Sequence, residues 1–430
     1  MSKELITNEM IDSSKDENAK SNKKQMVLII LCWISYIFAY LGRYGFSANI
    51  NLIISDYGVT KSQVGLVTSL FFFAYGVGQI VNGILSKRYN KRVIIPIALI
   101  LSAIFNICIF AGIPFEYIKY LWLLNGFSQS ILWPTLIEIL SKNTNQKKLK
   151  TAIIFMSTTT PLGTFFVYGM SAVLVSFNVY KYIFLIATIS MISMGILWFF
   201  SYNKYKSETE MAKESTDVSQ ETQPVQKNKI TSMLMIFITT MCIFAIFDNL
   251  IKDGLTTWVP TILKDLYNLP DNLSILLTIL LPVLGTFGAL LAIAINKTIK
   301  NYSLLTVLFY AISLILLSSS FLVINSKFSW IALIILFGLT VLNMHAINNV
   351  VTSMVPLFMR EKINSGLLAG ILNGFCYVGS TISSYGLAKI VETSNSWNTM
   401  FYSLIGGAIL CIIVGMIEYF ISAKANKNKQ

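Results

Sequence analysis

Long apolar runs recur along the whole chain, and each approaches the roughly 20 residues that a helix needs to cross a bilayer. Short polar or basic stretches separate the runs. A membrane barrel would instead show strands of about ten residues with alternating polarity, which these runs lack. The pattern predicts an all-α polytopic membrane protein with twelve transmembrane helices, at 26–53, 61–86, 93–113, 118–141, 150–176, 180–202, 231–263, 273–296, 302–324, 328–357, 363–391 and 396–423.

The composition supports this class. The 430 residues are 55% hydrophobic and only 12% charged, whereas soluble domains are about a quarter charged. The formal net charge of +13 would suggest nucleic acid as the partner of a soluble protein. In a membrane protein the same excess is expected in cytoplasmic loops, so we interpret it as a topology signal and expect no nucleic-acid partner.

Two pseudo-symmetric six-helix halves are expected, at 26–202 and 231–423. Between them, 203–230 is rich in Lys, Glu, Ser, Thr and Gln without apolar periodicity, which is typical of a solvated linker. Residues 1–25 are polar and of mixed charge, and we expect a disordered cytoplasmic tail there. Residues 424–430 are expected to form a second short cytoplasmic tail.

The orientation follows from counting lysines and arginines in the connections between predicted spans. Connections on one side carry twelve of them and connections on the other side carry six. Because cytoplasmic loops are enriched in these residues, we place both termini and the linker in the cytoplasm. The expected location is the cytoplasmic membrane of the cell.

One cation lies inside the first predicted span of each half. Arg43 and Lys252 are each followed two residues later by a glycine. A charge in hydrocarbon is costly, so it usually pairs or faces an aqueous cavity. An arginine also binds phosphate or carboxylate with two parallel hydrogen bonds, which lysine does not do. We expect Arg43 and Lys252 to meet in one central substrate site.

Carboxylates flank the second of these cations. Asp248 precedes Lys252 by four residues and shares its helix face, while Asp253 lies about 100° around the helix. One interpretation is that Asp248 and Lys252 neutralise each other so that the helix inserts. The other is that both carboxylates line the site, where one carries a proton or binds a substrate ammonium. The four charges sum to zero, which favours a monoanion, a zwitterion or a proton-coupled substrate over a phosphate dianion.

Aromatic and imidazole side chains are further candidates for the site. Tyr36 and Tyr40 precede Arg43 by seven and three residues, so all three share a helix face. They serve either as hydroxyl donors to a polar substrate or as packing. His345 is the single histidine of the chain, and it acts either as a proton relay or as a packed, hydrogen-bonded residue beside neighbouring asparagines.

Several motifs resemble the major facilitator superfamily and, within it, the organophosphate:phosphate antiporter group. They are Tyr40-Leu41-Gly42-Arg43, Ala74-Tyr75-Gly76, Gly83-Ile84-Leu85-Ser86-Lys87-Arg88-Tyr89-Asn90-Lys91-Arg92-Val93, Gly126-Phe127-Ser128-Gln129 with Trp133-Pro134, Gly254 with Trp258 and Pro260-Thr261, and Gly370 to Gly379. The resemblance implies two six-helix bundles that rock around a cavity at mid-membrane.

The resemblance also implies roles for single positions. Cations on the first and seventh helices of that group bind the substrate phosphate, and Arg43 matches the first of them. Lys252 stands where the group usually has arginine, so the charge is kept but the planar fork is lost. Thr160 stands where some members have a histidine, which makes a histidine-dependent step at that position unexpected.

The connection after the second span departs from the superfamily motif. Lys87 stands where the superfamily has aspartate, and Glu138 stands where the fourth helix of the group often ends in arginine. Our hypothesis is that Lys87 and Glu138 form one swapped ion pair. Together with Gly83, Arg88 and Arg92 of the same motif, it would latch a conformation. The alternative is two independent charges that reach the membrane interface.

The sequence holds no GxxxxGK[ST] phosphate loop, no nucleophile–base set and no metal-ligand spacing among its five scattered cysteines. We therefore expect no enzyme activity, cofactor or metal. The predicted function is a monomeric secondary transporter of a small, polar, anionic organic solute. By resemblance it exchanges an organophosphate for phosphate. Proton symport of another organic anion, such as a sugar acid, and a non-transporting sugar-phosphate sensor are the alternatives.

Overall fold

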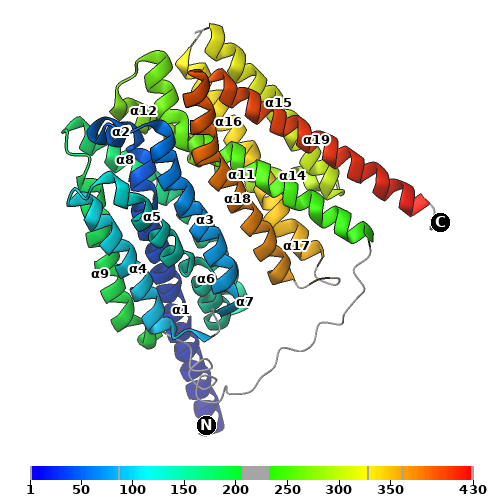
Figure 1. The fold of residues 1–430 in the computed structure, drawn as a ribbon. Coiled ribbons are helices and arrows are strands. Elements are labelled where there is room, and N and C mark those ends of the chain that lie inside the picture. Colours follow the sequence, from blue (N-terminus) through cyan, green and yellow to red (C-terminus); the bar gives the residue numbers. More distant parts are fainter. Residues whose placement is uncertain are drawn as a thin grey trace.

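The structure, a computed structural model, is helical and contains no β-strand in the part of the chain that it describes. The described residues are 2–85, 88–205, 232–326, 329–359, 363 and 365–427. Figure 1 shows the helices of the first half in blue to green and those of the second half in green to red, packed side by side as two groups.

The first group contains α1 (Ser2–Ala48), α2 (Ile50–Tyr57), α3 (Lys61–Leu85), α4 (Lys91–Phe110), α5 (Phe115–Ser130), α6 (Leu132–Asn143), α7 (Gln146–Ser157), α8 (Thr159–Ser176) and α9 (Tyr182–Tyr205). The second group contains α11 (Ser232–Tyr267), α12 (Asp271–Thr278), α13 (Leu280–Gly285), α14 (Gly288–Asn296), α15 (Tyr302–Ser326), α16 (Trp330–Asn349), the π-helix η2 (Val350–Met354), α17 (Val355–Phe358), α18 (Ser365–Ser394) and α19 (Asn398–Lys427).

Eleven described helical segments are long and apolar enough to cross a membrane, which confirms the predicted fold class. Their bounds lie within a few residues of the prediction in most cases, as in Lys61–Leu85 for the predicted 61–86. The first span ends earlier than predicted, because α1 ends at Ala48 and α2 follows Asn49. The Asn49 amide donates to the carbonyl of Gly45, a local bond that competes with regular helix structure.

The fourth predicted span, 118–141, is also helical, but it is not one of these eleven apolar segments. It is divided into α5 and α6 at Ile131. Its low hydropathy has a structural reason, because its polar side chains Asn125, Ser128 and Gln129 are buried between helices rather than exposed to lipid. A helix inside a bundle can carry such groups when they are hydrogen-bonded.

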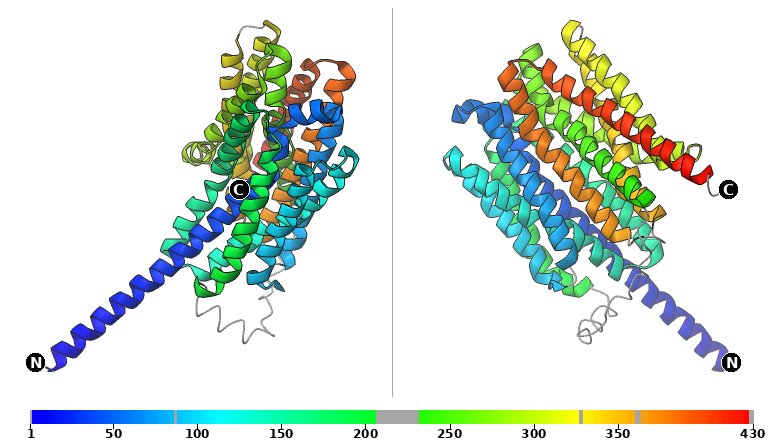
Figure 2. Two further views of the ribbon diagram at one scale, coloured as in Figure 1. Left: turned by 90° about the vertical axis from the view of Figure 1, so that its left-hand side faces the viewer. Right: turned by 45° about the vertical axis from the view of Figure 1, so that its right-hand side comes forward.

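The N-terminal tail differs from the expectation of disorder. Helix α1 begins at Ser2, and Figure 2 shows its first part projecting away from the bundle. The transmembrane part of α1 removes the cost of nucleation, and the Glu and Lys residues of the tail are good helix formers. At the other terminus, α19 continues to Lys427, into the predicted tail. Most of the predicted linker, from 206 on, lies outside the described residues.

The two groups pack together through α3 against α18 and through α8 against α12 and α13. Small residues let α3 and α18 approach closely, since a Cβ at Gly65 would collide with the carbonyl of Ser384 and one at Gly76 with the side chain of Tyr377. One hydrophobic core extends from the second group into the first near Val64. The groups are therefore joined at the end of the molecule where α3 begins.

Polar bonds reinforce this junction, which we call the closed end. Lys61 of α3 forms an ion pair with Asp265 of α11, with Nζ and Oδ2 2.7 Å apart. Trp397 donates its indole N–H to the same carboxylate at 3.2 Å. The backbone N–H of Ser62 donates to Glu392 of α18 at 3.0 Å. We call the opposite end, where α3 ends at Leu85 and α4 begins at Lys91, the basic end.

Candidate functional site

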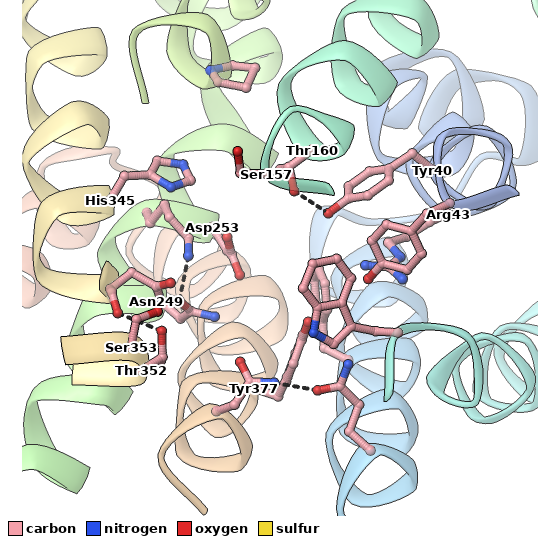
Figure 3. Close-up of a pocket in the computed structure, with 18 of the residues that line it drawn as sticks. Tyr40, Arg43, Ser157, Thr160, Asn249, Asp253, His345, Thr352, Ser353 and Tyr377 are labelled. Atoms are coloured by element: carbon pink, nitrogen blue, oxygen red, sulfur yellow. Dashed lines mark hydrogen bonds between the residues drawn. The ribbon is translucent and has the colours of Figure 1, made fainter. Parts of the chain in front are cut away.

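A cavity of about 730 Å³ lies between the two helix groups. Figure 3 shows Tyr40, Arg43 and Thr160 on one side of it and Asn249, Asp253 and His345 on the other. From this level the cavity extends toward the basic end, where its lining includes Gly83, Glu138, Ser353 and Gly370. Both cations predicted for the central site, Arg43 and Lys252, line this cavity.

Arg43 is surrounded by aromatic rings. Its side chain is only 4% exposed, and its guanidinium carbon is 4.2 Å from the ring centroid of Tyr75 and 4.9 Å from that of Tyr40. Nε donates to Gln129 at 3.2 Å, whereas Nη2 has no hydrogen-bond partner among the described residues. A buried donor without a partner is uncommon in proteins, so this nitrogen is available to an acceptor.

The tyrosines predicted beside Arg43 are held by hydrogen bonds. The hydroxyl of Tyr36 is 2.9 Å from that of Tyr75, and the hydroxyl of Tyr40 is 2.7 Å from Oγ1 of Thr160. Thr160 therefore holds the ring of Tyr40 beside Arg43. This is the position discussed above for the histidine of some antiporter-group members. These bonds define the ring orientations around the guanidinium.

Lys252 is bound by an amide rather than by a carboxylate. Its Nζ donates to Oδ1 of Asn249 at 2.6 Å. Asp248 is fully buried, and its Oδ2 accepts a hydrogen bond from Asn348 at 2.9 Å, while Oδ1 has no partner among the described residues. Asp253 lines the cavity and accepts from the hydroxyl of Ser380. The direct pairing of Asp248 with Lys252, one of the two interpretations above, is not formed.

His345 lines the cavity from α16. Its ring packs against Gly285 of the second group, where a Cβ would collide with the ring. Asn348, one of the asparagines expected to hold His345, instead donates to Asp248. The packed position is thus observed, but the expected bond to this asparagine is not.

Sequence reasoning missed several residues around the two cations. Tyr75 and Gln129 lie in motifs quoted for the family resemblance, yet they were not assigned to the site. Asn249 precedes Lys252 by three residues and so shares its helix face, which was the available signal. Ser380 and Asn348 could be recognised as site residues only because each is a polar residue in an apolar helix.

The residues of the predicted latch make contacts within the first group. Glu138 forms ion pairs with Lys142 at 2.7 Å and with Lys91 at 3.4 Å. Arg92 donates to the carbonyl of Phe199 at 3.0 Å. Gly83 lines the cavity, and Arg88 is exposed at the basic end. Lys87 lies outside the described residues, so its pairing with Glu138 stays a prediction.

Comparison with known proteins gives a family match. Residues 32–356 match the family model described as Major Facilitator Superfamily. The chain is 22% identical over 429 residues to a probable hexose phosphate transport protein of Chlamydia pneumoniae, covering 92% of this chain and 91% of the relative. It is 25% identical over 271 residues to the hexuronate transporter of Bacillus subtilis strain 168, covering 62% of this chain and 63% of the relative.

A solved structure shows the same fold. The crystal structure of a bacterial homologue of the human lysosomal transporter Spinster, in an inward-facing and occupied conformation, superposes with a TM-score of 0.72. The alignment covers 93% of this chain and 97% of that chain, at 12% sequence identity.

Proposed function

The chain belongs to the Major Facilitator Superfamily, and we propose that it is a secondary active transporter that binds a small anionic organic solute between Arg43 and Lys252. The solute is organophosphate-like or a sugar acid, as in the relatives named for hexose phosphate and hexuronate. The role of the protein is transport and not catalysis. It is a multi-pass membrane protein, and we place it in the cytoplasmic membrane as a monomer.

The observation that carries this proposal is the state of Arg43. A guanidinium that is 4% exposed, lines a cavity and keeps one nitrogen unbonded is suited to bind an oxyanion. Lys252 supplies a second cation from the other helix group. The site therefore has one cation on each of the two helix groups, and alternating access would move these groups relative to one another.

Hydroxyl-bearing side chains suit the remainder of a sugar-like solute. The hydroxyls of Tyr40 and Thr160 line the cavity beside the two cations, and the carboxylate of Asp253 adds acceptor oxygens. A phosphate and a carboxylate each offer two oxygens that a guanidinium can bind with parallel hydrogen bonds, so the anion alone does not choose between a sugar phosphate and a sugar acid. The hydroxyls contribute hydrogen bonds that a buried polar solute needs.

The direction of opening supports an inward-facing state. The cavity extends toward the basic end, and the closed end is sealed by the contacts of Lys61 and Ser62. Because cytoplasmic loops are enriched in lysine and arginine, we propose that the basic end and both termini lie in the cytoplasm. In this state the solute site communicates with the cytoplasm.

Two modes of coupling are open to such a site. In antiport, the organic anion and inorganic phosphate compete for Arg43 and Lys252. In proton symport, Asp248, Asp253 or His345 would carry the proton. Asp248 is fully buried and has an oxygen without a partner among the described residues, whereas Asp253 and His345 line the cavity.

Exchange in proteoliposomes tests the proposal. Vesicles preloaded with phosphate are assayed for uptake of labelled glucose 6-phosphate, glycerol 3-phosphate and glucuronate, with Arg43→Lys as the matched control. We expect uptake of at least one anion that is lost in the control. Dependence on internal phosphate indicates antiport, and dependence on a pH gradient that Asp248→Asn or Asp253→Asn abolishes indicates symport. Binding without any flux would contradict transport and favour the sensor alternative.

A further inference from the structure

We infer that Asn249 is a positioning residue that holds the Lys252 ammonium for the substrate anion and keeps it from pairing with Asp248 or Asp253. The inference rests on the proposed function and deepens it, because it explains how a site of zero net formal charge still binds an anion. It assigns Ser380 and Asn348 to the same task, since these two side chains hold the carboxylates.

The three charged side chains in the middle of α11, those of Asp248, Lys252 and Asp253, each have a neutral partner. Lys252 donates to Oδ1 of Asn249 at 2.6 Å. The amide of Asn249 donates in turn to the hydroxyl of Ser380 at 2.9 Å, and that hydroxyl donates to Asp253. Asp248 accepts from Asn348 at 2.9 Å. One chain of hydrogen bonds thus runs from the ammonium to a carboxylate without bringing them into an ion pair.

The direction of these bonds is fixed by chemistry. An ammonium has only donors, so the side-chain oxygen of Asn249 must face Lys252 and its NH₂ must face Ser380. A flipped Asn249 side chain would lose the bond from Lys252, and Ser380 could bond to it only by donating its hydroxyl to Asn249 instead of to Asp253. The Asn249 side chain is also buried, at 5% exposure, which makes the loss of either bond costly.

The alternative partners of the ammonium are close. Asp253 and Asp248 both lie within electrostatic range of Lys252. In a medium of low dielectric constant an ammonium is attracted more strongly to a carboxylate than to an amide oxygen. An ion pair with either carboxylate would use up the charge that the substrate anion needs. Bonded to a single amide oxygen, Lys252 keeps two of its three N–H donors for other acceptors.

The packing of α18 on α11 makes this arrangement possible. A Cβ at Gly379 would collide with the carbonyl of Ile246, so only a glycine allows the two helices to approach this closely. The neighbouring Ser380 is thereby brought to both Asn249 and Asp253. Asn348 reaches the group from the third helix, α16.

Equilibrium binding to purified protein tests the inference, with inorganic phosphate, glucose 6-phosphate and glucuronate as probes. Asn249→Ala should weaken binding of the recognised probe roughly tenfold, because Lys252 then pairs with a carboxylate. In Asn249→Ala/Asp253→Asn or Asn249→Ala/Asp248→Asn the competing carboxylate is absent, and at least one of these double variants should recover most of the affinity. A merely structural asparagine would show no such rescue.

Two further variants complete the cycle. In a Lys252→Gln background, Asn249→Ala should have no additional effect on affinity. Asn343→Ala removes another buried membrane asparagine, which bonds Phe309 and Ser313, and should leave the affinity unchanged in the protein that folds. If Asn249→Ala itself fails to fold, Asn249→Asp takes its place, and the ion pair it forms with Lys252 should weaken binding at least as much.

The outcomes separate the two claims. If Arg43→Lys weakens binding but Asn249→Ala does not, or if neither double variant recovers affinity, the inference is wrong and the proposed function stands. If Arg43→Lys binds every probe as well as the wild type does, or if the wild type binds none of them, the proposed function fails and the inference fails with it.

Discussion

The guanidinium carbon of Arg43 lies 4.2 Å from the ring centroid of Tyr75, the shortest of four such contacts that surround this side chain. An aromatic face stabilises a cation without neutralising it. A carboxylate in the same place would compete with the substrate. The rings thus allow a charged group to be buried in the membrane interior while its positive charge remains available.

Replacement of Tyr75 separates the ring from its hydroxyl. Tyr75→Phe keeps the aromatic face and loses the bonds to Tyr36 and Gln79, so we expect anion affinity to fall no more than about threefold. Tyr75→Ala removes the cation–π contact, worth about 1 to 2 kcal/mol when desolvated, and should weaken binding about tenfold. Calorimetric titration with the recognised anion measures both. Equal losses in the two variants would mean that the hydroxyl, not the ring face, matters.

The ion pair of Lys61 with Asp265 should favour the closed end. Both side chains are 31% exposed, so the pair is worth about 1 kcal/mol at most, or about a fivefold change in population. Lys61→Asp or Asp265→Lys alone should increase labelling of a single cysteine placed at the closed end, in a background without the five native cysteines. The double exchange should return labelling to the wild-type rate; persistence of the increase would count against the pair as a gate.

Glu138 should contribute more to stability than its exposed partner does. Lys91 is 4% exposed and Glu138 13% exposed, so Glu138→Gln leaves a buried ammonium without this carboxylate and should destabilise the protein by about 3 kcal/mol. Lys142 is 45% exposed, and Lys142→Gln should cost only about 0.3 to 0.5 kcal/mol. Thermal unfolding in detergent measures both. A larger effect for Lys142→Gln would reverse this assignment.

A pH effect on stability is expected from Asp56, between the first two spans. Hydrogen bonds from Lys181 and Tyr180 hold the pKa of this carboxyl below its usual range. A lowered native pKa means that the pair stabilises the folded protein above the unfolded pKa of about 3.9 and that this contribution is lost as the pH falls below it. Wild type and Asp56→Asn should therefore differ in melting temperature at pH 7, and the difference should shrink as the pH falls from about 4 toward 3. A constant difference across this range would exclude the carboxylate as its source.

The apolar runs were sufficient to predict the spans and the fold class. Each membrane helix satisfies its own backbone hydrogen bonds and needs an apolar stretch as long as the bilayer core is thick. The runs did not predict the division of the fourth span, 118–141, into α5 and α6. The polar residues Asn125 and Gln129 of α5 are buried between helices. The apolar runs also failed for the N-terminal tail, where an existing helix is extended.

The site could be predicted only in part. An intramembrane cation is visible in the sequence because its cost is general, so Arg43 and Lys252 were found and both line the cavity. Their partners were not found, because whether Lys252 pairs with Asp248 or with Asn249 depends on which groups α16 and α18 bring to it. Helix spacing makes both pairs equally possible, and the contacts with Ser380 and Asn348 decide between them.

The most direct test of the central claim is an experimental structure of the protein with its anionic solute bound, beginning with glucose 6-phosphate. We predict that the anionic group lies between the helix groups, with oxygens 2.7 to 3.2 Å from Nη2 of Arg43 and from Nζ of Lys252. A solute bound in the cavity with its anionic group away from Arg43 would contradict the proposed role of this side chain.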